Sequence, residues 1–253
     1  MAGGNPIAMR LTHLHRWDLD YREAVEVQRR LASRVREGPP LERVRLVAAA
    51  DVSAGRKDEW IVAVVVVMRL GTFEVVEVRR AAMRAAWPYV PGCLSFREAP
   101  VVLEALRQVR SRPDLLLCDG QGRAHPRRMG LACHVGLAAG IPTVGCAKSL
   151  LVGEPAGLRP GVAGLRPGEA GALGQSRGSR TPLVDGGERI GTVLRTRTGV
   201  KPVYVSVGHR IDLASAERWV LETAPRFRLP EPARLAHQLV TQYKKEWTDR
   251  GSA

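Results

Sequence analysis

Two different spacings of hydrophobic residues divide the chain into predicted helices and strands. Over residues 18–37 the apolar side chains recur every three to four positions, which is the spacing of one buried face of an amphipathic helix. Three short stretches rich in β-branched residues follow, and they predict strands over residues 44–52, 60–70 and 72–78. Gly71 is the expected turn between the last two strands.

The second of these strands is apolar at every position from Ile61 to Met68. A strand of this kind is buried on both faces, so helices should cover both sides of the sheet. Further helices are expected at residues 95–109, 127–139, 212–222 and 231–245, and further strands at 114–118, 142–146, 188–197 and 202–207. Three strands in succession, followed by alternating strands and helices, predict an α/β fold with a mixed sheet flanked by helices, in one domain over residues 1–253.

Residues 155–182 differ from the rest of the chain in composition. They are rich in Gly, Pro and Arg, and they contain AGLRPGV followed directly by AGLRPGE, a tandem duplication. With almost no bulky apolar residues, such a segment cannot offset the entropy of becoming ordered, so it is expected to be a flexible surface insertion. It could add basic contacts to nucleic acid, but the low cost of long loops favours a neutral expansion.

The formal net charge of +14 favours a polyanionic partner, because Lys and Arg displace counterions from phosphate. Only five of the 39 basic residues are lysines, which indicates that the coding bias of a GC-rich genome contributes to the excess. Charge alone therefore supports nucleic acid and other partners about equally.

Other features of the composition bear on the compartment. The longest apolar run is too short to cross a bilayer, and the N-terminus lacks the apolar stretch of a secretory signal. A cytoplasmic protein without membrane contact is expected. The four cysteines form no Cys-x-x-Cys pair, and they are expected to be small buried residues rather than disulfides or metal ligands.

Two aspartates lie at the ends of predicted apolar strands. Asp51 interrupts VRLVAAADVS, and Asp119 ends DLLLCDG. A carboxylate is costly to bury there without a cation or hydrogen-bond partners, although Asp51 by itself could equally cap a turn. Side chains near strand ends converge on one crevice of an open sheet, and Mg²⁺ prefers carboxylate oxygens. Together the two aspartates indicate a metal site.

Glu98 has two interpretations. Ser95 and Glu98 match a capping box at the expected start of a helix, in which the Glu side chain reaches back to the amide of the cap residue. A position in the first helical turn would also let the carboxylate reach a metal at the mouth of the sheet. The residues themselves leave the two roles open.

Three further side chains could act on a phosphate or on the attacking water. His125 and His209 lie in expected loops, and either could position or deprotonate water near neutral pH. Taken alone, each is more simply a surface or capping histidine. Lys148 follows a predicted strand and could neutralise charge at the scissile phosphate. The other histidines are expected to be structural: His13, His15, His134 and His237.

The sequence Pro88-Tyr89-Val90-Pro91-Gly92 predicts a stiff loop with an aromatic side chain at its tip. Proline fixes φ on both sides of Tyr89, so the ring is held with little further loss of entropy. Such a tip could wedge into a base stack and hold a duplex open. A tyrosine packed into the core at a rigid turn is the simpler alternative.

Taken together, these segments resemble the endonuclease V family, whose fold is ribonuclease H-like. The matching blocks follow one another in that family's order and approximate spacing over nearly the whole chain: HRWDL, AADVS, PYVPGCLSFREAP, PDLLLCDGQGRAHPRRMGLACHVGL, IPTVGCAKS, VSVGHR and LPEPARLAH. Two departures are visible, the insertion at residues 155–182 and the cysteines at positions 93, 118 and 146. Neither replaces a residue expected to bind metal.

The resemblance implies a role for each candidate residue. The expected metal ligands are Asp51, Glu98 and Asp119, which would bind Mg²⁺, with Mn²⁺ as a substitute. His209 would place or activate the attacking water, and Lys148 and His125 would support the phosphate. The wedge would be Tyr89 with Pro88 and Pro91 beside it. The extruded hypoxanthine base would enter a pocket lined by backbone around Gly92, Leu94, Gly120 and Gly122.

The implied activity is that of a DNA repair endonuclease specific for deoxyinosine, the product of adenine deamination. Members of the family hydrolyse the second phosphodiester bond 3′ to the lesion and leave 3′-hydroxyl and 5′-phosphate ends. A monomer is expected. Inosine-containing RNA, or flaps and mismatches, stay open as the main substrate instead. A non-catalytic protein that binds inosine or nucleic acid is the alternative of another class, and the intact carboxylates argue against it.

Overall fold

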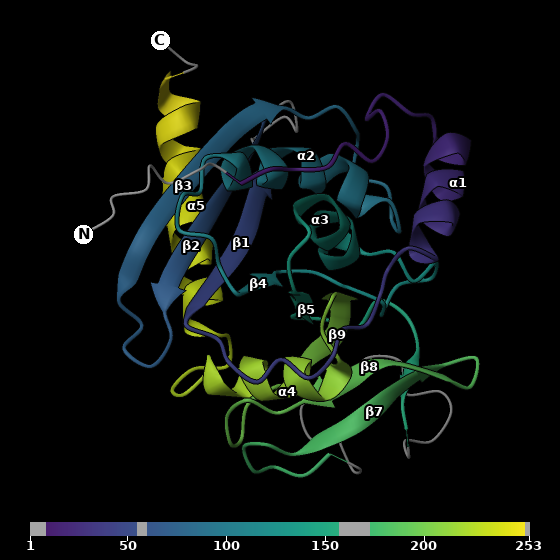
Figure 1. Cartoon of the computed structure of the whole chain (residues 1–253), viewed down its shortest axis with the longest axis vertical. Coiled ribbons are helices and arrows are strands. Elements are labelled where there is room, and N and C mark those ends of the chain that lie inside the picture. The colour runs from purple at the N-terminus through teal and green to yellow at the C-terminus, as the bar shows by residue number, and fades with distance from the viewer. Residues whose placement is uncertain (1–8, 55–59, 157–172, 251–253) are drawn as a thin grey trace.

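The computed structural model describes residues 9–54, 60–156 and 173–250, and its strands form one mixed sheet (Figure 1). The strands are β1 (Leu46–Ala54), β2 (Trp60–Arg69), β3 (Val75–Arg84), β4 (Leu115–Cys118), β5 (Thr143–Ala147), β6 (Glu154–Pro155), β7 (Arg180–Asp185), β8 (Glu188–Leu194) and β9 (Val203–His209). The helices are α1 (Tyr21–Ala32), α2 (Leu94–Arg107), α3 (Leu131–Ala139), α4 (Leu213–Glu222) and α5 (Glu231–Arg250). The strand order across the sheet is β3-β2-β1-β4-β5-β9-β8-β7-β6.

The directions of the strands decide which of their ends lie together. β1, β4 and β5 are parallel neighbours, whereas β2 is antiparallel to β1 and β9 is antiparallel to β5. The carboxyl ends of β1, β4 and β5 therefore lie at one end of the sheet. The carboxyl end of β9 lies at the opposite end.

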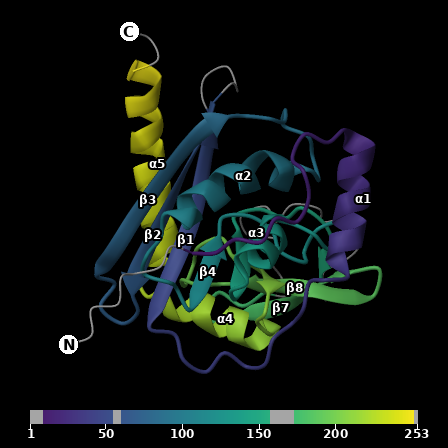
Figure 2. The same ribbon diagram turned by 45° about the horizontal axis from the view of Figure 1, so that its top comes forward.

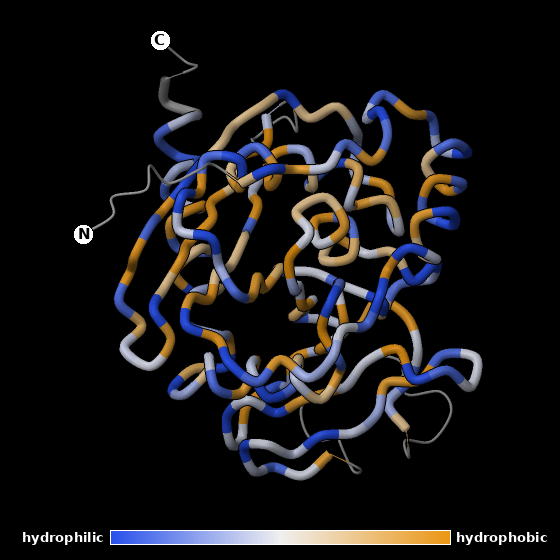
Figure 3. Tube along the Cα trace, in the orientation of Figure 1, coloured by the Kyte–Doolittle hydropathy of each residue, from blue (hydrophilic) through white to orange (hydrophobic). Residues whose placement is uncertain are grey.

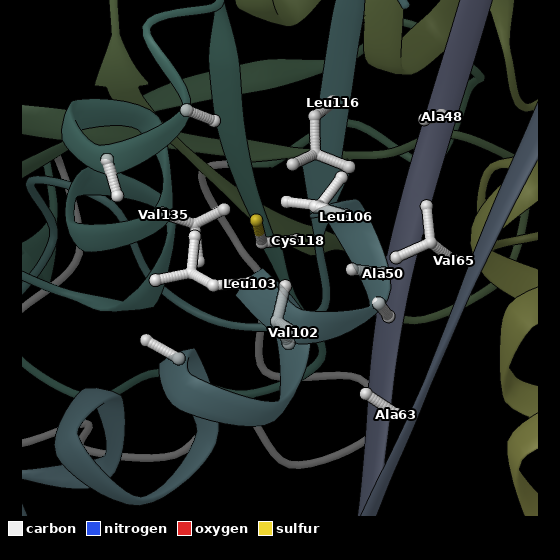
Figure 4. Packing of buried hydrophobic residues seen from close by; sticks show 14 of the residues in the cluster. Ala48, Ala50, Ala63, Val65, Val102, Leu103, Leu106, Leu116, Cys118 and Val135 are labelled. Carbon is white, nitrogen blue, oxygen red and sulfur yellow. The ribbon is translucent and has the colours of Figure 1, made fainter. Parts of the chain in front are cut away.

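Helices cover both faces of the sheet, as the apolar run in β2 predicts. Alternate residues of this strand belong to two separate hydrophobic clusters, one shared with α2 and α3 and the other with α4 and α5. Figure 2 shows α2 and α5 on opposite sides of β1, β2 and β3. Figure 4 shows Ala50 and Val65 in the first cluster together with Leu106 of α2. Each fully buried valine or leucine contributes about 1.5–3 kcal/mol to stability, so this double covering holds the central strands firmly.

α1 is the amphipathic helix that the N-terminal periodicity predicts. Asp20 caps it, and Glu23 completes a capping box with Asp20. Figure 3 shows hydrophilic and hydrophobic residues alternating along α1, in contrast to the mostly hydrophobic α3. The buried face of α1 includes Leu31 and packs in one cluster with Trp87 and Phe96. This contact ties α1 to the start of α2.

The predicted mixed sheet flanked by helices is confirmed, and two of the boundaries that differ have a clear structural reason. α3 begins at Leu131 rather than at residue 127, because Arg128 has a φ of 54° and this left-handed backbone cannot continue a helix. β3 extends to Arg84 rather than ending at residue 78. It is an edge strand with one solvated face, so its polar residues hide its length from a search for apolar runs.

Both ends of the predicted insertion belong to strands. Pro155 lies in β6, and residues 180–182 lie in β7. The expected loop is wrong at these positions, because β6 is two residues long and leaves β7 close to the sheet edge, where proline is tolerated. Most of the duplicated sequence falls in residues 157–172, which lie outside the described residues. Among the helices that the structure describes, none has the length and apolar character needed to span a bilayer.

Candidate active site

Asp51 and Asp119 come together because β1 and β4 are parallel neighbours. Asp51 lies within β1, and Asp119 directly follows β4 with its amide donating to the Ala50 carbonyl at 3.3 Å. Asp51 is 7% exposed, and its Oδ1 accepts a hydrogen bond from the Val52 amide at 2.9 Å. Burial and the neighbouring charge of Asp51 raise the pKa of Asp119. The two carboxylates therefore repel each other in a poorly solvated crevice.

His237, which lies in α5 and far along the sequence, is close to both aspartates. Its Nδ1 lies 2.7 Å from Oδ2 of Asp51, and one ligand atom from each of Asp51, Asp119 and His237 lies within 4.8 Å of the other two. The expectation that His237 is structural rests on its local sequence, where no strand end or loop marks it, and the contact with Asp51 corrects that expectation. A signal was nevertheless present, since His237 ends LPEPARLAH, one of the blocks that carry the family resemblance.

Glu98 approaches the aspartates from α2. Burial, followed by the charges of Asp51 and Asp119, raises the pKa of Glu98 to about 8. The capping-box interpretation of Glu98 is wrong, because Cys93 is the residue that precedes the helix and Ser95 lies inside it. The Ser95 hydroxyl is instead 3.2 Å from Nδ1 of His134. The Glu98 carboxylate is thus free of a capping role and sits in the field of two like charges.

Lys148 follows β5, and its ammonium group contacts the carboxylate cluster that Asp51, Asp119 and Glu98 form. Its Nζ donates to Oδ2 of Asp119, and this hydrogen bond and charge act to lower the pKa of Asp119. The Lys148 carbonyl accepts a hydrogen bond from Arg228 at 2.7 Å, which fixes the turn after the strand. The lysine side chain is 36% exposed, so the ammonium group can also meet a solvent-borne ligand.

The donor atoms of this cluster fit a hard divalent cation. Carboxylate oxygens are the preferred ligands of Mg²⁺, which keeps several further positions for water and phosphate. Burial, followed by repulsion among the carboxylates, raises the pKa values of Glu98 and Asp119, and a cation placed between them would offset that repulsion. Asp51, Asp119, Glu98 and His237 are the residues that could hold it.

His209 lies far from these groups. It ends β9, and its partner in the antiparallel ladder is Thr143, the first residue of β5, whereas Lys148 follows the last. The four steps between the first and last residues of β5, at roughly 3.3 Å each, separate its two ends by about 13 Å. The expectation that His209 reaches the carboxylates is therefore contradicted by the strand direction.

His125 braces a loop instead of facing the carboxylates. Its Nδ1 accepts a hydrogen bond from the Arg127 amide at 3.2 Å, so Nε2 carries the proton and donates to the Gly92 carbonyl at 3.0 Å. Burial and the charge of Arg127 lower the pKa of His125 to about 4, which keeps the ring neutral. Gln28 and Arg127 also donate to the Gly92 carbonyl. Three donors thus fix the backbone at Gly92, which ends the loop that carries Tyr89 (the tyrosine loop).

The loop that carries Tyr89 projects into solvent from two fixed ends. Tyr89 is 66% exposed, which excludes the alternative of a tyrosine packed in the core, and Pro88 and Pro91 are exposed beside it. Trp87, before the loop, is buried and donates from Nε1 to the Trp17 carbonyl at 3.2 Å. Because Gly92 is held at the other end, both ends of the loop that carries Tyr89 are fixed.

A small cavity of about 70 Å³ opens beneath Tyr89. Gly92 and Leu94 line it as predicted, together with Ser95, Gln121, His125, Leu131, Leu151, Pro91 and Tyr89. Gly120 and Gly122 are not among the lining residues. Gly122 is required elsewhere, because a side chain there would collide with the Val207 carbonyl of β9. The cavity shares two segments with the carboxylate cluster, residues 94–98 and 119–121.

Comparison with known proteins identifies a family for most of this chain. The family model described as Endonuclease V matches residues 29–238. The chain is 45% identical over 231 residues to the endonuclease V of Myxococcus xanthus, an alignment that covers 91% of this chain and 92% of that protein.

Solved structures agree with the sequence comparison. The crystal structure of endonuclease V from Streptomyces avermitilis is similar at a TM-score of 0.81 and 40% identity, covering 92% of this chain and 96% of that one. The predicted ribonuclease H-like class is thereby confirmed. An endonuclease V of Ciona intestinalis, solved with a 24mer DNA containing an inosine followed by a ribo-adenosine, shares the fold at a TM-score of 0.74 and 24% identity, covering 89% of this chain and 98% of that one.

Proposed function

Because the chain belongs to the endonuclease V family, we propose that it is a cytoplasmic, monomeric DNA repair endonuclease specific for deoxyinosine. It hydrolyses the second phosphodiester bond 3′ to the lesion and leaves 3′-hydroxyl and 5′-phosphate ends. One observation carries the proposal: the carboxylate cluster, the cavity and the exposed tyrosine loop lie next to one another. They meet at two short segments, residues 94–98 and 119–121.

Asp51, Asp119 and Glu98 hold Mg²⁺, for which Mn²⁺ substitutes. When bound, the ion supplies positive charge that polarises the scissile phosphate and stabilises the departing 3′-oxygen. The raised pKa of Glu98 supports this assignment, because burial and the charges of Asp51 and Asp119 outweigh the opposing charge of Arg97. The crevice is electrostatically unfavourable until a cation enters it.

His237 takes the role expected of His209. Its Nδ1–H donates to Asp51 at 2.7 Å, which leaves Nε2 as a proton acceptor on a half-exposed side chain. Nε2 positions the attacking water and accepts its proton as the oxygen attacks phosphorus. The bond from phosphorus to the 3′-oxygen breaks, the 3′-oxygen takes a proton from solvent to become the 3′-hydroxyl, and the water oxygen stays on the 5′-phosphate. Lys148 stabilises a phosphate oxygen beside Asp119.

Recognition of the lesion precedes the cut. Tyr89 enters the base stack and the displaced hypoxanthine occupies the cavity behind the loop, where Gly92 and Leu94 present backbone groups. Extruding a base costs a few kcal/mol, and less for a weak inosine pair, so the extrusion step itself favours the lesion. The cavity residues Ser95 and Gln121 add polar groups to its wall.

A nicking assay tests the proposal. Purified protein with Mg²⁺ is incubated with a labelled duplex that contains one deoxyinosine, and the product ends are mapped. We expect one nick at the second bond 3′ to the lesion. Asp119→Asn and His237→Gln should lower the rate at least about 100-fold, the contribution typical of metal or general-base groups. Gln238→Ala, the exposed neighbour on α5, should leave the rate unchanged.

The same assay separates the remaining alternatives. Matched DNA and RNA strands with one inosine each decide the preferred backbone, and a flap or a mismatch without inosine tests structure-selective cutting. The Ciona protein was crystallised with an inosine followed by a ribo-adenosine, which makes the mixed strand an informative third substrate. Tight binding of the inosine duplex without any nick would favour a non-catalytic binding protein and contradict the proposed hydrolysis.

A further inference from the structure

A large cleft lies at the opposite end of the sheet from the carboxylate cluster. It has a volume of about 540 Å³ and is lined by the chain that follows α1, by the end of α3 and by the end of β9. The lining side chains that concern binding are Arg34, Arg36, Glu37, His209 and Arg210. A cleft of this size is large enough for a nucleotide. Because β5 separates it from Lys148, it is distinct from the proposed catalytic crevice.

The charge of this cleft is strongly positive. Arg34 and Arg36 are exposed, and within the described part of the chain neither guanidinium has an ion-pair or hydrogen-bond partner. Glu37 is the one acidic residue of the lining, and it is already paired with Arg123 at 2.9 Å. An entering anion therefore meets two guanidinium groups whose hydrogen-bond donors are not engaged by protein acceptors. Guanidinium groups bind phosphate in a bidentate geometry that lysine cannot match.

His209 supplies a buried polar group at the wall of the cleft. It is 8% exposed, and its Nδ1 accepts a hydrogen bond from the Arg36 amide at 3.3 Å. Its other ring nitrogen, Nε2, has no partner among the described residues, which leaves it as a donor for a ligand in the cleft. Burial, followed by the charges of Arg210 and Arg36, lowers the pKa of His209 to about 4. The positive field of the cleft thus reaches this ring.

The backbone around Arg210 is held in an unfavourable conformation. Arg210 has a φ of 54°, in the left-handed region that a non-glycine residue rarely adopts. Its amide donates to the Arg36 carbonyl at 2.7 Å and its Nη1 donates to the Gly140 carbonyl at 2.7 Å. Gly38 must lack a side chain, because a Cβ there would collide with the Arg210 carbonyl. Strain of this kind persists where surrounding contacts maintain it, and it often accompanies binding sites.

The ends of α1 and α3 near the cleft offer a simpler reason for the basic residues. Arginines favour helix C-termini because the carbonyl ends carry partial negative charge. Arg210 satisfies this role by bonding to Gly140, the C-cap of α3. Among the described residues, the guanidinium groups of Arg34 and Arg36 donate to no carbonyl at a helix end. Interaction with the helix ends therefore does not explain these two arginines.

We propose that this cleft is a second anion site, which binds the phosphate of a nucleotide or of a nucleic-acid strand other than the one being cut. Arg34 and Arg36 grip the phosphate oxygens, and Nε2 of His209 donates a further hydrogen bond. The remaining volume accommodates the attached sugar and base. The site does not depend on the proposed nuclease activity, since it shares no residue with the carboxylate cluster.

A binding experiment on the full chain in EDTA tests this site without cutting. Orthophosphate, adenosine 5′-monophosphate and a short single-stranded oligonucleotide lacking inosine are titrated separately. Binding is followed by calorimetry and by the NMR signal of the His209 ring. We expect at least one probe to shift the His209 signal. Arg34→Gln with Arg36→Gln should weaken that binding at least about tenfold, since two charge-assisted hydrogen bonds are lost.

The control variant is Arg29→Gln with Arg112→Gln, which removes the same charge from two exposed arginines outside the cleft lining. It should change the affinity by less than about twofold through general charge alone. A shift with phosphate and the nucleotide only would identify a free phosphate ligand, and a shift with the oligonucleotide only would identify a strand. No shift with any probe, or equal weakening in both double variants, would overturn the proposal.

Discussion

The Tyr89 side chain is highly exposed, and the backbone on both sides of its loop is held in place. A residue that displaces a base needs both properties. The ring stands in solvent, while Trp87 before it and Gly92 after it are tied to the core by hydrogen bonds. A flexible aromatic side chain would lose conformational entropy on entering a base stack, and the prolines at 88 and 91 remove much of that loss in advance.

Replacing Tyr89 by Ala should impair cutting of duplex DNA more than cutting of single strands. Stacking of one aromatic on one base is worth about 1–3 kcal/mol, so kcat/KM on an inosine duplex should fall about tenfold or more. On a single strand no partner base needs displacement, and the fall should be smaller. Rates on both substrates provide the measurement. Tyr21→Ala, at another exposed tyrosine on α1, is the matched control and should change neither rate. Equal losses on both substrates would contradict a wedge.

His209 and His237 show what a single sequence can and cannot reveal about residues. The position of His209 at the end of an expected strand predicts a place at the site, but the sequence does not state that β9 runs against β5. His237 lies 186 residues from Asp51 in the chain, and its contact with Asp51 depends on where α5 packs. The aspartates were predictable because Asp51 interrupts an apolar strand and Asp119 directly follows one. A residue that reaches the site by helix packing has no comparable local pattern.

At the scale of elements, a chain of hydrogen bonds joins three segments behind the tyrosine loop. Nδ1 of His15 lies 2.6 Å from the Arg16 carbonyl and therefore carries a proton, so its Nε2 accepts from Nε2 of His134 at 2.6 Å. Nδ1 of His134 then accepts from the Ser95 hydroxyl. The chain links the N-terminal segment, α3 and α2, and it requires both rings to be neutral. Burial lowers the pKa of His15 and lowers that of His134 to about 3.

Stability should therefore fall as the medium becomes acidic. A buried histidine with a depressed pKa contributes stability that is present above its unfolded value near 6.5 and is lost as pH falls toward the folded value. For His134 the loss between pH 7 and pH 5 is about 2 kcal/mol. Urea unfolding at several pH values measures it. His134→Asn should be less stable than wild type at pH 7 but should show a flatter pH dependence, whereas an equally steep dependence would contradict the assignment.

The elements themselves were largely predictable, with failures where the pattern is polar or broken. Continuous apolar runs predict the buried strands β1, β2 and β4, and the spacing of apolar residues predicts α1. β7 contains a proline and lies in a region dominated by Gly and Arg, so only its pairing with β8 identifies it as a strand. Pairing partners are a tertiary property, and a single sequence does not specify them.

For the molecule as a whole, the carboxylate cluster is a source of instability that function requires. Glu98 is embedded near two other acidic groups, and its pKa is raised above the unfolded value near 4.5. An acid with a raised pKa subtracts stability once the pH exceeds its unfolded value, and the penalty grows until the pH reaches the folded value near 8. On the proposed assignment, Mg²⁺ binding would remove this penalty and so couple the stability of the fold to the metal site.

Neutralising Glu98 should separate stability from activity. In EDTA, Glu98→Gln should raise Tm by several degrees, because each kcal/mol corresponds to roughly 2–4 °C for a chain of this size. The gain should increase from pH 5 to pH 8, and Mg²⁺ should stabilise the variant less than it stabilises wild type. Differential scanning calorimetry measures both effects, and Glu104→Gln on the exposed side of α2 is the control. A lower Tm for Glu98→Gln in EDTA at pH 8 would refute the repulsion argument.

The place of α5 in the chain adds a consequence for protein synthesis. Asp51, in β1, is translated long before His237, which lies in the last helix that the structure describes. On the proposed mechanism, a nascent chain that stops before this helix would contain the three carboxylates but would lack the imidazole that activates the attacking water. We therefore expect fragments released by premature termination ahead of α5 not to nick DNA.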